Sequence, residues 1–273
     1  MKILVTGANG YVGSTLCREL KNYEVTRLTR AEVDLTDQTE VDRWFQSRRF
    51  DTVIHCATSG GSRLKEDTSD VTHKNLQMFY NLLRNKHKFN KFINIGSGAE
   101  FDRYQSIAPI WIEDNKRYPI DPYGMSKSII HRLIENLENF YTIRVFALFD
   151  ENEWDTRFIK ANLKRYINKQ PIQVDKDRML DFFYMGDFLK VVEYYLTENR
   201  PPKEVECCYQ TKYHLSEVAN LINNLDTHKV ELKTGEEFDK AYFGRSMPLE
   251  VLKLKLIGLE QGIKQTYNKL SNV

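Results

Sequence analysis

Two side chains with complementary proton chemistry, Tyr123 and Lys127, stand four positions apart in a segment, residues 121–140, whose pattern predicts a helix. Residues spaced by four share one face of a helix, so the phenol and the ammonium group can reach each other. A nearby positive charge favours the phenolate and brings the ordinary tyrosine pKa of about 10 closer to neutrality. The spacing therefore indicates a proton donor or acceptor, with a surface pair of no catalytic role as the alternative.

A glycine-spaced turn at the start of the chain indicates a second function. Residues 2–6 form an apolar run typical of a buried strand, and residues 15–20 carry a helical pattern. Gly7, Gly10 and Gly13 stand between them. Such a turn directs backbone N–H groups and the positive end of a helix dipole at one spot, which suits the pyrophosphate of a dinucleotide. An ordinary strand-to-helix turn that merely uses glycine is the alternative.

Length and composition favour a globular protein with a sizeable core. The chain has 273 residues, of which 41% are hydrophobic, enough for one large α/β domain or one domain with a smaller lobe. Its 40 basic and 38 acidic residues leave a net charge of +2, which gives no broad electrostatic surface for nucleic acid or a membrane. We therefore expect neither as a partner.

The cysteines and the hydropathy pattern bear on location. The four cysteines have neither the spacing of a metal site nor the density of a disulfide scaffold, so we expect reduced thiols and no metal: Cys17, Cys56, Cys207 and Cys208. No apolar run approaches the roughly 20 residues that span a bilayer, and no secretion or lipidation signal is evident. These features predict a cytoplasmic protein.

Strand and helix patterns alternate along the first half of the chain. Strand patterns cover residues 24–28, 51–56, 91–95 and 142–148, with an extended piece at 31–36, and helical patterns cover 37–45, 69–84 and 121–140. This alternation is typical of βαβ units. It predicts an α/β fold, a Rossmann doubly wound parallel sheet with helices on both faces.

Beyond residue 150 helical and extended segments continue without a linker rich in Pro, Gly or Ser. We expect a dinucleotide-binding Rossmann domain over residues 1–150, with a return strand and helix near 205–226. Residues 151–273 would mainly form a smaller, discontinuous C-terminal lobe that binds the substrate. The segment 97–118 lacks periodicity, and we expect it to be a long loop.

These motifs together resemble an extended short-chain dehydrogenase/reductase of the nucleotide-sugar epimerase, dehydratase and reductase group. The resemblance runs nearly end to end. It rests on TGANGYVGS for the cofactor turn, IHCAT for the fourth strand, HKNLQMFYNLL for the helix below the nicotinamide, INIGSGAEF for the fifth strand and YGMSK for the catalytic pair. Farther on, LDFFYMGDF and CCYQTKYHLSEVANLI are similar to the later segments of the group.

The resemblance implies roles for individual residues. Tyr123 would donate or accept the proton, Lys127 would bind the nicotinamide ribose and depress the Tyr123 pKa, and Ser97 would hydrogen-bond the reacting carbonyl oxygen, although a strand-end cap is the alternative for Ser97. The cofactor-binding set would be Gly7, Asn9, Gly10, Tyr11, Val12, Gly13, Arg30, Asp34, Leu35, Cys56, Ala57, Thr58, Asn75, Tyr123 and Lys127. The substrate set would be Ser97, Gly98, Ala99, Arg178 and Arg245.

The cofactor choice depends on the end of the second strand. An NAD site usually places Asp or Glu there for the ribose 2′-OH, whereas a 2′-phosphate requires arginine. This chain has Arg30, with Arg27 close by, and the piece TRAEVDLTD is similar to the same region of NADP-dependent GDP-fucose synthase. We therefore predict NADP, with NAD as the alternative because Glu32 could take the acidic position.

The absence of acidic and basic residues after Ser97 limits the reactions that this site could catalyse. Gly98 and Ala99 stand where sugar dehydratases of the group carry an Asp-Glu pair, and Ala99 also replaces the cysteine of fucose synthase. Neither a hydrogen atom nor a methyl group can move a proton, so dehydration and 3,5-epimerisation are disfavoured. We predict NADPH-dependent reduction of a 4-keto (deoxy)sugar nucleotide in glycan or polysaccharide precursor synthesis, as in dTDP-4-dehydrorhamnose reductase and CDP-paratose synthase. An NAD-dependent C4 epimerase and a non-catalytic NADP-binding regulatory protein are the alternatives.

Substrate contacts and assembly are less defined. The group's arginine before Asp-Phe is here Leu180, so Arg178 is one candidate to replace it, and the asparagine after the sixth strand is Ala147. Arg245 is a candidate contact for a nucleoside diphosphate, with an exposed arginine without a ligand as the alternative. The resemblance further implies a nucleoside-diphosphate sugar as the partner and a homodimer through helices near 69–84 and 121–140.

Overall fold

The computed structural model describes residues 1–62, 65–102, 104–107 and 118–271. Within them, the main sheet has six strands in the order β2 (Glu24–Leu28), β1 (Lys2–Thr6), β3 (Phe50–His55), β4 (Phe89–Ser97), β5 (Phe140–Val145) and β9 (Glu204–Cys207). The pairs β1–β2, β1–β3 and β3–β4 are parallel. The chain therefore leaves β1 in one direction for β2 and returns on its other side for β3. This reversal is the point at which open α/β sheets bind ligands.

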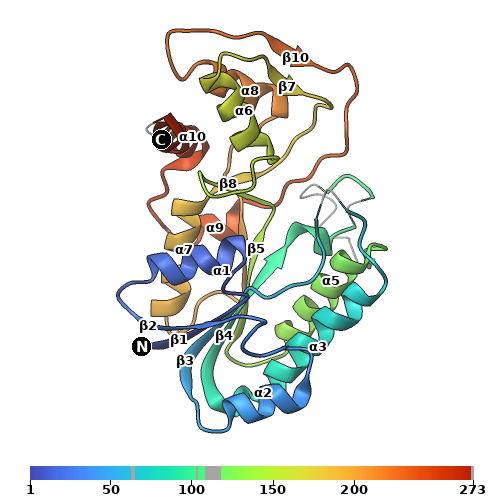
Figure 1. Cartoon of the computed structure of the whole chain (residues 1–273), viewed down its shortest axis with the longest axis vertical. Helices are drawn as coiled ribbons and strands as arrows, with labels where there is room; N and C mark the ends of the chain where they lie inside the picture. The colour runs from blue at the N-terminus through green and yellow to red at the C-terminus, as the bar shows by residue number, and fades with distance from the viewer. Residues whose placement is uncertain (63–64, 103, 108–117, 272–273) are drawn as a thin grey trace. The chain divides into compact units, whose positions relative to one another are not determined.

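Helices cover both faces of this sheet. The helices α2 (Gln38–Phe45), α3 (Asp70–Arg84) and α5 (Pro122–Glu135) lie along one face, and α1 (Tyr11–Glu19) lies on the other (Figure 1). Short 3₁₀ turns, η1 (Lys86–Lys88) and η2 (Gly98–Glu100), precede and follow β4. The predicted Rossmann-type fold is confirmed.

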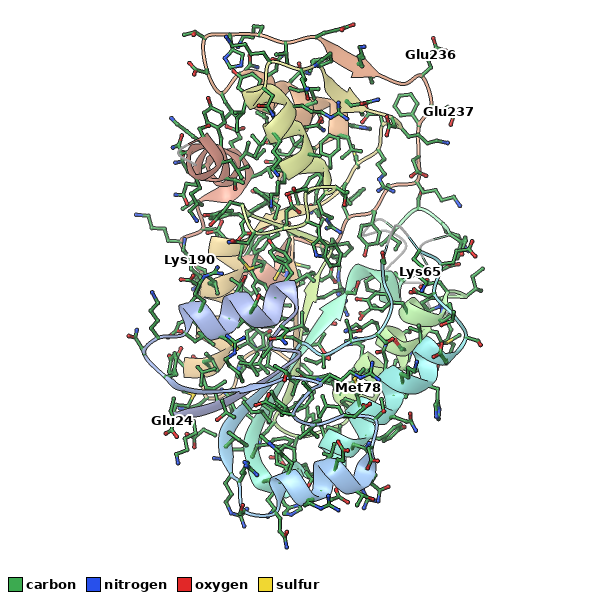
Figure 2. All side chains as sticks on the ribbon, in the orientation of Figure 1. Glu24, Lys65, Met78, Lys190, Glu236 and Glu237 are labelled. Carbon is green, nitrogen blue, oxygen red and sulfur yellow. The ribbon has the colours of Figure 1, made fainter. Side chains whose placement is uncertain are left out.

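The core under α2, α3 and α5 explains why these strands have nearly continuous apolar sequences. Leu4, Val53 and Phe92 project from three neighbouring strands onto Phe79 of α3, and all four are fully buried. Met78 of α3 lies in this core, whereas Glu24 at the edge of the sheet is exposed (Figure 2). Strands that are buried on both faces need apolar residues at successive positions rather than at alternate ones.

One predicted strand is wrong. Residues 31–36 form turns instead of an extended piece. The Asp34 carboxylate accepts the Thr36 N–H at 3.0 Å, and the Glu40 carboxylate accepts the Asp34 N–H at 2.9 Å. Because side chains take these backbone donors, the segment has no sheet ladder to supply them. Val33 and Leu35 are nevertheless buried, which explains the apolar pattern.

The chain divides into two compact units. The first comprises Met1–Arg103, Lys116–Arg144 and Glu193–Val205, and the second comprises Tyr104–Asn115, Val145–Val192 and Glu206–Val273. Part of the loop expected at 97–118 lies outside the described residues.

The second unit has two small parallel sheets. One pairs β6 (Ala147–Phe149) with β8 (Phe182–Tyr184), and the other pairs β7 (Ile172–Val174) with β10 (Leu232–Thr234). Its helices are α6 (Phe158–Ile167), α8 (Leu215–Asn223), α9 (Met247–Glu250) and α10 (Gly258–Ser271), and α7 (Met185–Thr197) begins in this unit and ends in the first. No helix among the described residues is long and apolar enough to cross a membrane.

Candidate active site

The start of α5 brings Tyr123 and Lys127 together. Asp121 caps the helix by accepting the Gly124 N–H at 2.8 Å, and Pro122 occupies the first turn, where its missing N–H costs nothing. The Lys127 Nζ lies 5.6 Å from the centre of the Tyr123 ring. The predicted shared face is therefore present in the structure.

The Lys127 ammonium group is almost completely buried. It is 5% exposed, and Nζ donates a hydrogen bond to the carbonyl oxygen of Ile95 at 2.9 Å. Burial lowers the pKa of Lys127 to about 8, because removal from water disfavours the charged form. A lysine with this pKa changes its charge close to physiological pH.

Ser97 ends β4 and begins the turn η2. Its Oγ accepts the Ala99 N–H at 3.2 Å, so the strand-end cap considered for this serine is present. The turn η2 also packs against the start of α5, because a Cβ placed on Gly124 would lie 2.4 Å from the Ala99 oxygen. Glycine at this position is what allows the serine turn and the start of α5 to pack against each other.

The glycine turn between β1 and α1 fits a dinucleotide phosphate. Gly7 has a φ of +65°, and a Cβ there would lie 2.7 Å from the Ala57 backbone. Both the backbone conformation of the turn and the close approach of Ala57 therefore require glycine. A Cβ on Gly13 would lie 2.2 Å from the Gly7 oxygen, which places α1 directly on the end of β1. Gly10 is the N-cap and provides no side chain over the helix N-terminus, which includes Tyr11 and Val12. This N-terminus is a suitable seat for an anion.

Asn75 of α3 connects the loop after β3 to α5 by hydrogen bonds. Its Oδ1 accepts the Ser59 N–H at 2.7 Å, and its Nδ2 donates to the Ser59 oxygen and to the Ser126 Oγ at 3.0 and 2.9 Å. The residues Cys56, Ala57 and Thr58 precede this anchor. Asn75 was predicted as a cofactor contact, and the structure gives it a role in holding the loop beside Tyr123.

Comparison with known proteins identifies the family. The model of the NAD dependent epimerase/dehydratase family matches residues 3–208, more than half of the chain. The chain belongs to this family. It is therefore an NAD(P)-dependent enzyme of the extended short-chain dehydrogenase/reductase type, which confirms the resemblance inferred from the motifs.

Three similar proteins illustrate the range within the epimerase/dehydratase family. A spore coat polysaccharide biosynthesis protein of Bacillus subtilis is 28% identical over 198 residues, covering 70% of this chain and 68% of its own. CDP-abequose synthase of Yersinia pseudotuberculosis is 21% identical over 258 residues, covering 86% and 88%. A GDP-mannoheptose C4 reductase of Campylobacter jejuni, solved with NADP bound, superposes with a TM-score of 0.79 at 19% identity over 98% and 97% of the chains.

For an enzyme of this family, the segment after β2 bears on cofactor choice. Arg30 is 81% exposed in its side chain and pairs with Asp34 at 3.2 Å. The Glu32 carboxylate accepts both the N–H and the hydroxyl of Thr29, at 2.9 and 2.8 Å, and these hydrogen bonds lower its pKa. The Arg27 Nη2 lies 3.4 Å from the Asn9 Oδ1. Arg27 and Arg30 thus lie at and just after the end of β2, whereas the Glu32 carboxylate is already hydrogen-bonded to Thr29.

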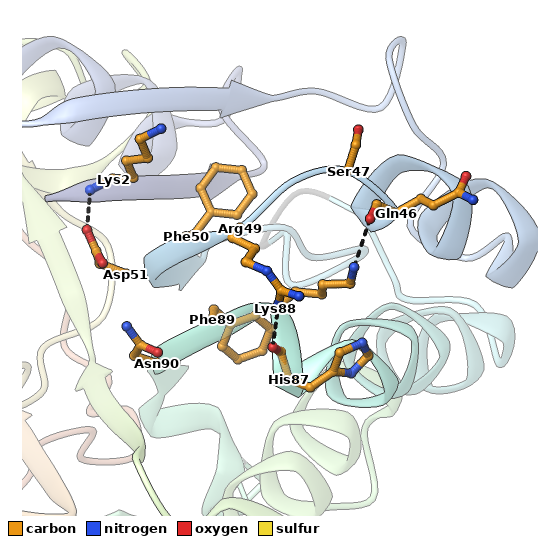
Figure 3. A pocket seen from close by; sticks show the side chains of 10 residues that line it. All are labelled: Lys2, Gln46, Ser47, Arg49, Phe50, Asp51, His87, Lys88, Phe89 and Asn90. Atoms are coloured by element: carbon orange, nitrogen blue, oxygen red, sulfur yellow. Dashed lines mark hydrogen bonds between the residues drawn. The ribbon is translucent and has the colours of Figure 1, made fainter.

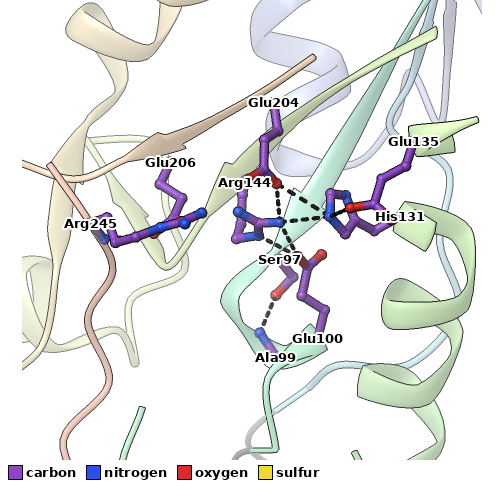
Figure 4. Close-up of polar contacts among 9 residues, drawn as sticks. All are labelled: Ser97, Ala99, Glu100, His131, Glu135, Arg144, Glu204, Glu206 and Arg245. Atoms are coloured by element: carbon purple, nitrogen blue, oxygen red, sulfur yellow. Dashed lines mark hydrogen bonds and ion pairs between the residues drawn. The ribbon is translucent and has the colours of Figure 1, made fainter. Parts of the chain in front are cut away.

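The two candidate substrate arginines, in the second unit, both have carboxylate partners. The Arg178 Nη1 donates to Asp239 at 2.9 Å, and the Arg245 Nε donates to the fully buried Glu206 at 2.8 Å (Figure 4). These pairs fix the orientation of each guanidinium. Sequence reasoning did not single out Lys212, which donates to Asp181 at 2.8 Å, because this pair is 31 positions apart in the chain.

A separate hollow in the first unit lies away from these residues. It has a volume of about 670 Å³ and lies at the amino ends of β3 and β4, lined by Lys2, Gln46, Ser47, Arg49, Phe50, Asp51, His87, Lys88, Phe89 and Asn90 (Figure 3). Lys88 and Arg49 use their side chains to bind the backbone oxygens of Gln46 and His87. Ser97 and the glycine turn stand at the carboxyl ends of their strands, so this hollow is not part of the candidate active site.

The glycine turn gives a paired prediction. Gly13→Ala forces α1 away from β1, so we expect the free energy of unfolding to fall by about 1–3 kcal/mol. Gly10→Ala places its Cβ 3.3 Å from the Gly7 oxygen, which the fold tolerates better, but it adds a methyl group at the phosphate seat. We expect this variant to unfold near the parent and to bind NADP(H) roughly tenfold more weakly. Urea unfolding and fluorescence titration measure both effects, and a Gly13→Ala protein as stable as the parent would contradict the packing argument.

Proposed function

We propose that this enzyme reduces a 4-keto (deoxy)sugar nucleotide with NADPH, in glycan or polysaccharide precursor synthesis. The observation that carries the proposal is that Gly98 and Ala99, which have no acid or base, directly follow Ser97 beside the Tyr123–Lys127 pair. The nearest acid along the chain, Glu100, is buried in an ion pair with Arg144. A site of this composition supports reduction at one carbon better than dehydration or 3,5-epimerisation.

Each residue of the candidate site has a distinct role in this reaction. Bound NADPH supplies the hydride. Ser97 Oγ hydrogen-bonds the reacting carbonyl oxygen and holds it beside Tyr123, whose hydroxyl gives that oxygen its proton. The Lys127 ammonium lowers the cost of the phenolate that remains. The glycine turn and α1 hold the pyrophosphate, and Asn75 fixes the loop that borders Tyr123.

Several features support NADPH over NADH. Arg30 and Arg27 offer guanidinium groups for a 2′-phosphate, whereas Glu32 is engaged by Thr29 and is a poor candidate for a ribose hydroxyl. The Campylobacter jejuni C4 reductase was solved with NADP bound, and CDP-abequose synthase is a similar protein, although the shared fold alone does not separate reductases from epimerases. The proposal includes a cytoplasmic location and a homodimer through α3 and α5.

The catalytic assignment predicts the behaviour of Tyr123→Phe. Loss of the hydroxyl removes the proton donor, so we expect turnover of a 4-keto-6-deoxy sugar nucleotide to fall by about 10²–10⁴-fold, with NADPH affinity within about twofold of the parent. Loss of NADPH absorbance at 340 nm follows the reaction. Tyr194→Phe, at a partly exposed position of α7, is the matched control and should keep full activity. Parent-like turnover by Tyr123→Phe would exclude the assignment.

The cofactor assignment predicts a preference for NADPH that Arg30 supports. We expect NADPH to bind at least about tenfold more tightly than NADH, and Arg30→Ala to remove about tenfold of the NADPH affinity alone, because a charge-assisted contact to phosphate is lost. Arg48→Ala, where the guanidinium lies over Trp44, is the control. Equal affinities for the two cofactors in the parent protein would favour the C4 epimerase that recycles bound NAD.

The Lys127 pKa predicts the pH profile. Below its pKa of about 8 the lysine is charged and favours the Tyr123 phenolate, and above that pH the charge is lost. We therefore expect kcat to fall as the pH rises above about 8, approaching a loss of about tenfold per pH unit. Lys127→Arg keeps its charge, so the decline that follows the lysine pKa should be absent and loss of the Tyr123 proton, the donor in this reaction, should alone limit the rate at alkaline pH. A parent rate that stays constant to pH 10 would contradict the role of the ammonium charge.

A further inference from the structure

A buried ion-pair network lies beneath the serine turn. Arg144 of β5 is 1% exposed, and its guanidinium is ion-paired with Glu100 of η2 (Figure 4). The Arg144 Nη2 also donates to the Glu204 carboxylate of β9 at 2.7 Å. One guanidinium thus joins β5, β9 and the turn that begins at Ser97.

The same network reaches the catalytic helix through His131. This residue follows Lys127 by four positions, so it lies on the same face of α5. Its Nε2 lies 3.3 Å from the Arg144 Nη2 and 3.2 Å from the Glu204 carboxylate. Burial, followed by the charge of Arg144, lowers the pKa of His131 to about 4, so the imidazole is neutral at pH 7. The network can therefore bind α5 without adding a second positive charge.

The network holds the serine turn from two sides. Glu100 is the last residue of η2, and the Arg144 guanidinium lies 4.8 Å from the ring centre of Phe101, the next residue. Within the turn, the Ala99 N–H binds the Ser97 Oγ. A buried ion pair often adds no net stability relative to apolar residues of similar volume, because both ions lose their hydration. The main effect of this ion pair is therefore to fix the position of the turn rather than to add net stability.

We infer that Glu100 is a positioning residue, which Arg144 locks so that the Ser97 turn stays against the helix that bears Tyr123 and Lys127. This inference rests on the proposed function. Burial has the largest effect on the Lys127 pKa and lowers it, while Cys56 and then the Glu100 carboxylate raise it. Because Arg144 contacts both η2 and α5, it holds Ser97 and Tyr123 at positions from which both can reach one carbonyl oxygen.

Other titratable groups near Lys127 do not replace this charge. They come from the end of β3 and from α5 itself: His55, Cys56, Tyr123 and His131. Burial lowers the pKa of His55 to about 3 and raises the pKa of Cys56 to about 12, so both are neutral at pH 7. A neutral Cys56 thiol carries no charge that could stabilise the ammonium at pH 7, so Glu100 is the charged group named here that opposes the effect of burial.

The test uses Glu100→Gln, which keeps the length of the side chain and removes its charge. We expect kcat to fall about tenfold or more, with KM for the sugar nucleotide and NADPH affinity within about twofold of the parent. The alkaline decline of kcat should move to lower pH by about one unit, since Lys127 loses its proton more easily. Glu100→Asp, which keeps the charge on a shorter side chain, should restore the position of that decline.

Two further measurements keep the inference separate from the proposed reaction. Glu135→Gln is the matched control, since Glu135 lies 3.6 Å from His131 with a side chain 55% exposed, and it should leave kcat and the pH profile unchanged. Phenolate absorbance, as the difference between each protein and its Tyr123→Phe counterpart, reports the Tyr123 titration without any substrate. In Glu100→Gln this titration should move to lower pH, because the carboxylate charge that disfavours a nearby phenolate is gone and Lys127 is already largely neutral where tyrosine titrates. A parent protein that reduces no keto sugar would refute the reaction only, whereas a folded Glu100→Gln with an unshifted phenolate titration would overturn the inference.

Discussion

A nearly buried ammonium group sets the conditions for the rest of this active site. Taking a lysine charge out of water costs several kcal/mol unless other groups stabilise it. The Ile95 carbonyl and the Glu100 carboxylate provide part of that stabilisation, and the remaining imbalance leaves the Lys127 pKa at about 8. The elements around Lys127 therefore present polar atoms to an otherwise apolar interior, as the carbonyl of Ile95 in β4 does.

The same requirement accounts for the partners of the surrounding polar residues. Asn75 satisfies the loop after β3 and the hydroxyl of Ser126, and Thr6 Oγ1 lies 2.9 Å from the His55 Nδ1 in the core. Each of these contacts joins residues far apart in the chain. Under the proposed function, such contacts would help to hold Ser97 and Tyr123 where both can reach one oxygen atom.

Features with a local signal could be predicted from the sequence. The strand, glycine turn and helix at residues 2–20, and the four-residue spacing of Tyr123 and Lys127, depend on neighbours within a few positions. The Arg144–Glu100 pair could not be found in this way, because its members are 44 positions apart and each resembles an ordinary surface charge. The carboxylate partners of Arg178 and Arg245 were missed for the same reason. At residues 31–36 the apolar pattern was correct, but Asp34 and Glu40 captured the backbone donors that a strand would have used.

The contact between Gly13 and Gly7 and the exposed edge at Arg30 differ in how freely they can change. At Gly13 no room exists for even one carbon atom, whereas Arg30 and Glu32 project from a segment that hydrogen-bonds within itself. Substitutions at that edge leave the sheet, the turn and the catalytic helix untouched. If Arg30 sets cofactor preference as proposed, that preference is separable from the proposed proton transfer, and natural variation or laboratory selection could alter the one without the other.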